Sequence, residues 1–141
     1  MSVAAMEPTT QHAPVGFEPM FGPTGFVTTC RTFYFNPETR VTAAFVEEGH
    51  KNPLGIAHGG FLATLADSAF GMTIRAALGS ARPPMTVSLA VDYLSPAPVG
   101  AWVEARVEIH KVGSRMINAT CLLSCGEKLV ARSSAVLLTP T

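Results

Sequence analysis

The chain has 141 residues, a length that suits one domain and leaves no room for a second domain with its own core. Hydrophobic residues make up 48% and charged residues only 14%, so the composition excludes disorder and predicts that part of the apolar surface covers a subunit interface. The formal net charge is zero and the ten Lys and Arg are spread along the chain, which argues against a nucleic-acid partner and against electrostatic binding to a membrane.

The first 25 residues contain four prolines and three glycines, which disfavour regular structure. We therefore expect a flexible tail over residues 1–25 and a single domain over residues 26–141. The N-terminus has no positively charged and apolar leader, and no later segment is expected to cross a bilayer. The sequence thus predicts a protein of the cytoplasm that does not enter a membrane.

A β-hairpin is predicted first in the domain. Residues 28–36 are aromatic and β-branched, residues 40–47 continue in the same way, and Asn36-Pro37-Glu38-Thr39 is typical of a turn between two strands. Residues 49–57 contain Asn, Pro and Gly and predict an irregular loop.

A long helix is predicted from Gly59 to Leu78. Apolar residues occur on every side of this helix, so we expect other parts of the protein to enclose it. Gly79 is a natural residue to end it, and the two prolines at positions 83 and 84 prevent it from resuming.

Four strands are predicted after the helix. Apolar and polar residues alternate over residues 86–93 and 102–110, and residues 115–125 and 128–138 form two further strands joined by a turn. In the first strand the alternation groups Val87 with Leu89. A hairpin, one long helix and four strands predict an α+β fold in which an antiparallel sheet curls around a central helix.

The cysteines and histidines show no metal pattern. Cys30, Cys121 and Cys125 cannot all pair with one another, and none belongs to a CxxC motif, so we expect buried thiols. The four histidines lack the spacing of metal ligands. The sequence predicts no metal and no cofactor.

Asp67 is the only ionisable residue between His58 and Arg75, in the middle of the helix expected to be buried. An ionised carboxylate out of water costs several kcal/mol, so this group must be paired, hydrogen-bonded, exposed at an interface cleft or protonated. A structural role, with hydrogen bonds from a neighbour such as Thr64 or Ser68, and a catalytic role both stay open. Asp92 is expected to face solvent.

The start of the helix is a second unusual feature. Residues 56–60 offer no Ser, Thr, Asp or Asn as a cap, so we expect the first amides to lack partners. Gly59 and Gly60 permit close approach, and the helix dipole favours a carbonyl or oxyanion there. An ordinary loop-to-helix junction is the alternative.

Gly59 and Asp67 lie eight residues apart, which corresponds to about 12 Å along one helix. They cannot both touch one small reacting group. If both are catalytic, the site combines the helix start of one subunit with Asp67 of another, in agreement with the predicted oligomer.

The run from Asn52 through His58-Gly59-Gly60 to Asp67 resembles the signature of hotdog-fold acyl-CoA thioesterases, in the PaaI-type branch of the 4-hydroxybenzoyl-CoA thioesterase superfamily. Residues 91–100 also resemble a strand and turn of that family, and the resemblance covers about residues 27–138. It implies the hotdog fold, hydrolysis of an aryl- or fatty-acyl-CoA to free acid and CoA, and a homodimer or a homotetramer built as a dimer of dimers with active sites at the subunit interface.

The resemblance also implies roles for single residues. The Gly59 amide would stabilise the oxyanion, and Asp67 of the partner would act as general base or nucleophile. Asn52 would orient the water or the thioester, His58 would shape the same corner, and Thr86 would help to place the water. No GxSxG motif is present, which argues against an α/β-hydrolase route.

Substrate binding is assigned less directly. Gly60 is expected to lie against the substrate, and Phe61, Phe70 and Met72 are either pocket or core residues. The CoA phosphates require cations to bind them, and the candidates are Arg82, Lys111, Arg115 and Lys128. For each of these residues, the alternative is an ordinary solvated charge on the surface.

Two other functions are compatible with this fold class. A hydratase or dehydratase of the same fold uses a different residue pattern, which the Asn, His-Gly-Gly and Asp spacing does not match. A non-catalytic module that binds or senses acyl-CoA would not need Asp67. Burial of an ionised carboxylate costs free energy, so the presence of Asp67 in this helix favours the catalytic function.

Overall fold

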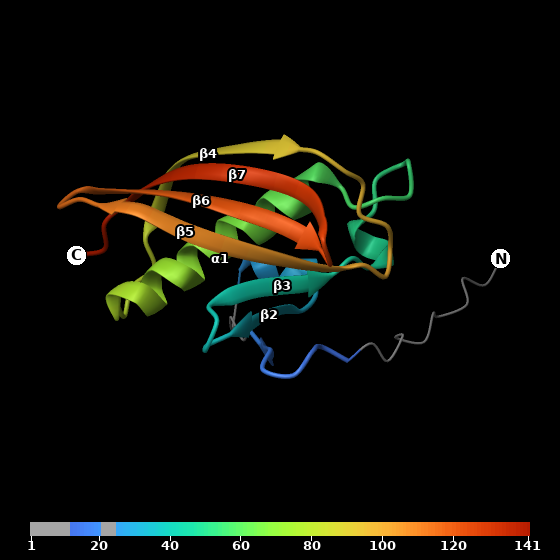
Figure 1. Ribbon diagram of the computed structural model, residues 1–141, viewed down its shortest axis with the longest axis horizontal. Coiled ribbons are helices and arrows are strands. Elements are labelled where there is room, and N and C mark those ends of the chain that lie inside the picture. Colours follow the sequence, from blue (N-terminus) through green and yellow to red (C-terminus); the bar gives the residue numbers. More distant parts are fainter. Residues whose placement is uncertain (1–11, 21–24) are drawn as a thin grey trace.

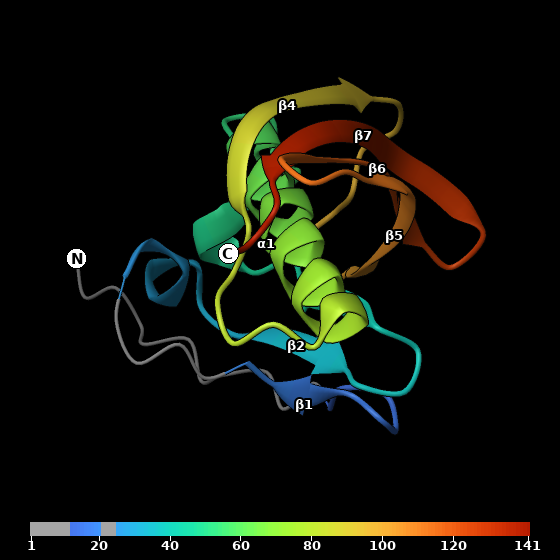
Figure 2. The ribbon, with the colours of Figure 1, turned by 90° about the vertical axis from the view of Figure 1, so that its left-hand side faces the viewer.

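The computed structural model describes residues 12–20 and 25–141, in which a seven-stranded antiparallel sheet curls around one long helix (Figures 1 and 2). The strand order is β1-β2-β3-β5-β6-β7-β4. The elements in chain order are β1 (Glu18–Pro19), η1 (Phe26–Cys30), β2 (Phe33–Asn36), β3 (Val41–Phe45), η2 (Glu48–His50), α1 (Gly59–Leu78), β4 (Met85–Tyr93), β5 (Trp102–Val112), β6 (Met116–Cys125) and β7 (Lys128–Leu138). The predicted α+β class and hotdog arrangement are confirmed.

The sheet buries one face against the helix. Along β6 the burial alternates residue by residue, and the residues that point inward are Ile117, Ala119, Cys121 and Leu123. The helix contributes large side chains to the same core, among them the fully buried Leu65, Phe70 and Ile74. Each such side chain stabilises the fold by about 1.5–3 kcal/mol relative to exposure, so this face of α1 fixes the helix in the sheet.

The first hairpin has the predicted turn but a shorter first strand. Asn36 Oδ1 accepts hydrogen bonds from the amides of Glu38 and Thr39 at 3.0 and 3.1 Å. β2 begins only at Phe33, because η1 occupies the preceding residues. The hydroxyls of Thr28 and Thr29 each donate to a carbonyl three residues earlier at 2.6 Å, which favours a helical turn over extended chain there.

Part of the segment expected to be a flexible tail lies on the sheet. Glu18 pairs with Phe35 and Pro19 with Tyr34 in an antiparallel bridge, and the ring of Phe17 packs edge-on against Trp102 at 5.1 Å. Proline lacks an N–H and is tolerated here because β1 is an edge strand. Residues 1–11 and 21–24 lie outside the described residues, so for them the tail stays a prediction.

Helix α1 has the predicted bounds but not the predicted enclosure. It ends at Gly79, which takes a left-handed conformation with φ 61°. We expected no segment that could cross a bilayer, but α1 is long and apolar enough to do so. In this structure, however, α1 is the core helix against which the sheet packs. One side is not covered by this chain, and the residues on it are Gly60, Thr64, Asp67, Ser68, Gly71, Met72 and Arg75.

Strand β4 forms one edge of the sheet and contains a bulge. Its register with β7 shifts between Thr86 and Ser88, so Thr86 pairs with the inward-pointing Leu137 while Val87 is 53% exposed. The predicted alternation, which grouped Val87 with Leu89 on one face, is therefore wrong at Val87. A bulge adds one residue to a strand and redirects its side chains, and here it turns Thr86 toward the helix.

The three thiols differ in exposure. All are free, but only Cys121 is buried, whereas Cys30 and Cys125 are partly exposed, so the prediction of buried thiols is wrong for these two. Burial raises the pKa of the Cys121 thiol from its ordinary value to about 12. At pH 8 its thiolate is therefore scarce, and the thiolate is the reactive form.

We expect Cys121 to resist alkylation in the folded protein and to react once the protein unfolds. Mass spectrometry of peptides after iodoacetamide treatment, with and without urea, measures this. Cys125, on the same strand, is the internal comparison and should be alkylated faster without urea. Equal labelling of the two thiols in the folded protein would contradict the burial of Cys121.

Candidate active site

The start of α1 is capped, although the sequence predicted no cap. His58 is the N-cap residue, and its Nδ1 accepts a hydrogen bond from the Gly60 amide at 2.8 Å. A ring nitrogen thus does what a Ser or Asp oxygen usually does. The Gly59 amide has no hydrogen-bond partner among the residues that the structure describes. It is therefore an amide at this helix end that can receive an oxygen from outside.

The loop before the helix is shaped by Asn52. Its side-chain Oδ1 accepts hydrogen bonds from the backbone amides of Leu54 at 2.9 Å and Ile56 at 3.3 Å. The backbone amide of Asn52 donates to the Ile56 carbonyl at 2.8 Å. The side-chain oxygen is therefore occupied by the loop. Only the Nδ2 group is left for the predicted role of Asn52 toward water or thioester, and that role stays a prediction.

His50 holds this region together and was not singled out from the sequence. The side chain is buried, and its Nδ1 accepts from the Glu47 amide at 2.9 Å. Nε2 therefore carries the hydrogen and donates to the Cys30 carbonyl at 2.7 Å. The ring stacks on Phe61 at 3.9 Å, and the His50 carbonyl accepts from the His58 amide at 2.7 Å. Apart from the contact with Glu47, which is three residues away, these contacts join His50 to residues eight or more positions away, so no local signal marks them.

Tyr93 is a second residue that sequence analysis missed. Its hydroxyl donates to the Gly59 carbonyl at 2.6 Å, so the last residue of β4 holds the first residue of α1. A Cβ on Gly59 would lie 3.0 Å from the Tyr93 ring, which explains why a glycine suits this position. Partial burial raises the pKa of Tyr93 above its ordinary value of 10.0, so the hydroxyl stays protonated at neutral pH.

Asp67 forms the second cluster of the site, with Thr86. The Thr86 hydroxyl donates to Asp67 Oδ1 at 2.7 Å. Asp67 is exposed within one chain, contrary to the expected burial, because it lies on the uncovered side of α1. Thr64 does not serve it, since the Thr64 hydroxyl donates to the Gly60 carbonyl at 2.8 Å. The carboxylate faces a cavity of about 230 Å³ whose wall includes Pro83 and Thr86.

The two clusters do not meet within one chain. Eight residues of helix, or about 12 Å, separate Gly59 from Asp67. Two of the sequence-predicted residues, Asp67 and Thr86, are brought into direct contact, while His58 and Gly60 are joined at the helix start. The arrangement offers an exposed carboxylate at one place and an unpartnered helix-end amide at the other.

None of the four predicted phosphate-binding cations lines the cavity at Asp67 or the cavity at the helix start. Lys111 and Arg115 are exposed at the hairpin between β5 and β6, and Lys128 donates to the Pro96 carbonyl at 2.9 Å. Arg82 is exposed in the turn after α1, one residue before the wall of the Asp67 cavity. Lys51 was missed: it lines a cavity of about 400 Å³ at the helix start and pairs with Glu48 at 2.6 Å.

No group of three His, Cys, Asp or Glu that could hold a metal ion occurs within residues 12–20 and 25–141.

The chain is similar to known proteins whose names describe them as esterases or thioesterases. A family model for the thioesterase superfamily matches residues 54–131. PA0474 of Pseudomonas aeruginosa is 35% identical over 132 residues, which cover 92% of this chain and 98% of that protein. Mouse acyl-coenzyme A thioesterase 13 is 36% identical over 84 residues, 60% of this chain and 59% of the mouse protein.

A solved structure shows the same fold. It is that of a variant of the phenylacetic acid degradation protein PaaI from Thermus thermophilus, which has a TM-score of 0.65 and 33% sequence identity. The similarity covers 71% of this chain and 84% of that chain.

Proposed function

The chain belongs to the thioesterase superfamily and is a thioester hydrolase, and on that premise we propose that Asp67 and the Gly59 amide carry out the hydrolysis of an acyl-CoA. The observation that carries the proposal is the Thr86 hydrogen bond to Asp67 Oδ1, which fixes a carboxylate at the wall of an open cavity. The unpartnered Gly59 amide supplies the second requirement, a donor for an oxyanion.

The chemistry needs no further catalytic group. Water attacks the thioester carbonyl while Asp67 takes one of its protons, the carbonyl oxygen becomes an oxyanion bound by the Gly59 amide, and the carbon–sulfur bond breaks. The proton held by Asp67 then passes to the CoA thiolate. In the alternative route Asp67 itself attacks, and water hydrolyses the resulting anhydride. Label found in Asp67 after turnover in ¹⁸O-labelled water identifies the second route, because only an anhydride opened by water at the Asp67 carbonyl places the label there.

We propose that a second copy of the chain completes the site. The uncovered side of α1 carries mainly small residues, and β4 next to it is an edge strand on which Met85 and Val87 are exposed, with Leu94 exposed directly after it. A copy that covers both features would place its Gly59 near Asp67 of the first chain, which one helix alone cannot do. The unit is then a homodimer, or a tetramer made of two such dimers.

Mixed dimers test this arrangement. Co-expression of Asp67→Asn and Gly59→Ala chains with different tags gives, by random pairing, half heterodimers with one intact site each, so activity should return to about a quarter of the wild-type value. Each variant alone should remain inactive. If both residues act within one chain, the mixture will be as inactive as its components.

The activity itself is measured as thiol release from a panel of phenylacetyl-, benzoyl-, short-chain and medium-chain acyl-CoAs. The panel includes aryl and fatty groups because the similar proteins comprise both a phenylacetic acid degradation protein and an acyl-CoA thioesterase. Turnover supports the proposal. Tight binding without turnover would favour the sensing module.

Thr86→Val should lower kcat about 10- to 100-fold with little change in KM. Valine keeps the shape of threonine but removes the hydroxyl, and a hydrogen bond to a charged group contributes about 1.5–3 kcal/mol. Steady-state kinetics on the best substrate measures the effect. Thr120→Val, on the outer face of β6, is the matched control and should leave kcat unchanged. A rise in KM alone would show that Thr86 binds substrate rather than positions Asp67.

Tyr93→Phe should lower kcat about 3- to 10-fold, because the ring stays but the Gly59 carbonyl loses a neutral hydrogen bond of about 0.5–1.5 kcal/mol. The pKa of Tyr93 is raised, so wild-type Tyr93 remains protonated below pH 10 and the ratio of wild-type to variant kcat should stay constant between pH 6 and 9. A pH–rate profile of both proteins measures this. A ratio that falls within that range would mean that Tyr93 ionises and does not act as a donor.

A further inference from the structure

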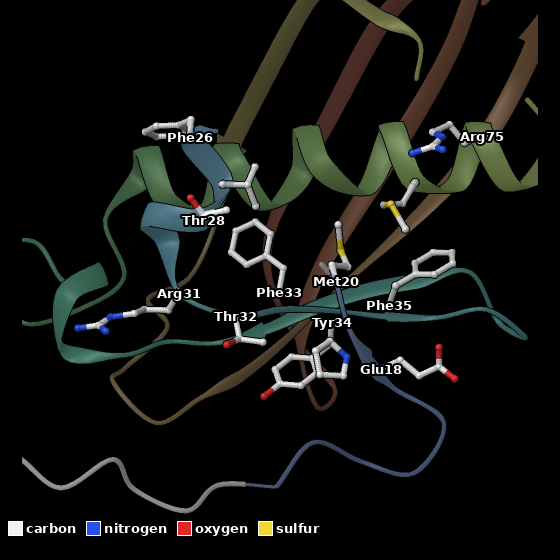
Figure 3. A pocket seen from close by; sticks show the side chains of 13 residues that line it. Glu18, Met20, Phe26, Thr28, Arg31, Thr32, Phe33, Tyr34, Phe35 and Arg75 are labelled. Carbon is white, nitrogen blue, oxygen red and sulfur yellow. The ribbon is translucent and has the colours of Figure 1, made fainter. Parts of the chain in front are cut away.

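A large cavity adjoins the Asp67 cavity. It has a volume of about 980 Å³ and lies between α1, β2 and the N-terminal segment (Figure 3). Met20, Met72 and Arg75 line both cavities, so the two cavities are adjacent. An acyl group whose thioester carbon sits at Asp67 would therefore have the larger cavity next to it.

Apolar side chains form a large part of the wall of this cavity, together with polar side chains that include Thr28 and Thr32. Phe33 and Phe35 lie two residues apart on β2 and point toward the helix with Met20, whereas Tyr34 points away (Figure 3). Glu18 pairs with Phe35 and therefore lies on the same face, at the edge of the cavity. The cationic side chains of Arg31 and Arg75 lie at its two ends (Figure 3). The apolar residues that line it are Met20, Phe26, Val27, Phe33, Phe35 and Met72.

Size and shape indicate the class of acyl group. Ligand cavities span about 300–1,000 Å³, and this one lies at the upper end, so a short acyl or a single aromatic ring would leave most of it unfilled. Methionine side chains are flexible and adapt to a ligand without a fixed shape. Both features fit a long flexible chain better than a small rigid ring.

We propose that this cavity binds the acyl group and that the substrates are unbranched medium- to long-chain fatty acyl-CoAs, with Met20 as a residue that sets the accepted chain length. The inference rests on the proposed function, because that places the reacting thioester at Asp67. Met20 is well placed for this role, since its amide donates to the Phe33 carbonyl at 2.7 Å and fixes it between the two cavities. The chain-length limit thus comes from the segment that precedes the domain core.

The test is kcat/KM over a series of acyl-CoAs from acetyl to palmitoyl, with phenylacetyl-CoA included. The wild-type protein should be most active between octanoyl and tetradecanoyl. Met20→Trp fills the junction and should lower kcat/KM for dodecanoyl-CoA about 10-fold or more while butanoyl-CoA changes by less than about twofold. Met20→Ala should move the optimum toward longer chains. Val15→Trp, a fully exposed site in the same segment, adds the same bulk and should change nothing.

The outcomes separate this inference from the proposed function. If no CoA ester is hydrolysed, the proposed function fails. If hydrolysis occurs but phenylacetyl- or acetyl-CoA is preferred and the Met20 variants keep the wild-type profile, the acyl assignment alone is overturned. Size-exclusion chromatography of Met20→Trp adds a second readout: dissociation of the oligomer would mean that a second copy of the chain fills the cavity, which also overturns the assignment.

Discussion

Asp67→Asn should fold like the parent protein and lose about 10³-fold in kcat, with KM changed by less than about twofold. The amide oxygen of asparagine can still accept the Thr86 hydroxyl, so the local geometry survives while the group that takes the proton is lost. Little stability should be lost, because Asp67 is exposed and makes no ion pair among the described residues. Thiol release and thermal unfolding measure the two effects.

The chain provides a matched control for this variant. Asp92 is the only other aspartate, lies on β4 like Thr86, and pairs with Arg132 at an exposed site at 3.0 Å. Asp92→Asn should keep wild-type kcat and lose less than about 1 kcal/mol of stability. If Asp67→Asn retained more than about a tenth of wild-type kcat, Asp67 would be a structural residue and the proposed mechanism would be wrong.

Gly59→Ala should lower kcat about 10²- to 10³-fold and destabilise the protein by about 1–3 kcal/mol. The new Cβ would lie 3.0 Å from Cζ and 3.1 Å from the hydroxyl oxygen of Tyr93, so the ring or the helix start must shift. Either shift moves the amide from the oxyanion position, and loss of one such donor costs a factor of this size. Kinetics and urea unfolding of the variant measure both quantities.

A double-mutant cycle shows whether the contact with Tyr93 is the cause. In a Tyr93→Ala background the added methyl group has room, so the destabilisation by Gly59→Ala should shrink by at least about 1 kcal/mol. If the two substitutions are additive in free energy, the steric explanation fails.

The sequence predicted well those features that depend on local chemistry. The bounds of α1 follow from a long apolar segment between the Gly59-Gly60 pair and Gly79, and the turn after Asn36 follows from the ability of its side chain to bind nearby amides. The strands after the helix follow from alternation. The contact between Asp67 and Thr86 agrees with the site implied by the family resemblance.

Features that depend on contacts between distant residues were not predictable in this way. Tyr93 and Gly59 are 34 residues apart, and their hydrogen bond exists only because the sheet curls over the helix. The bulge at Val87 is set by the register with β7, and Asp67 is exposed because it lies on the side of α1 that the rest of the chain leaves uncovered. The cap at His58 was missed because a histidine is an unusual N-cap residue.

The two edges of the sheet differ in a way that limits how large a strand-paired assembly can become. β1 is only two residues long and ends in Pro19, which has no N–H to offer to another strand. β4 is nine residues long and open. Copies that pair through β4 use the single available edge and leave only blocked edges outside. Such pairing ends at two chains and cannot propagate into a fibre, so any larger oligomer must form through a surface other than the sheet edges.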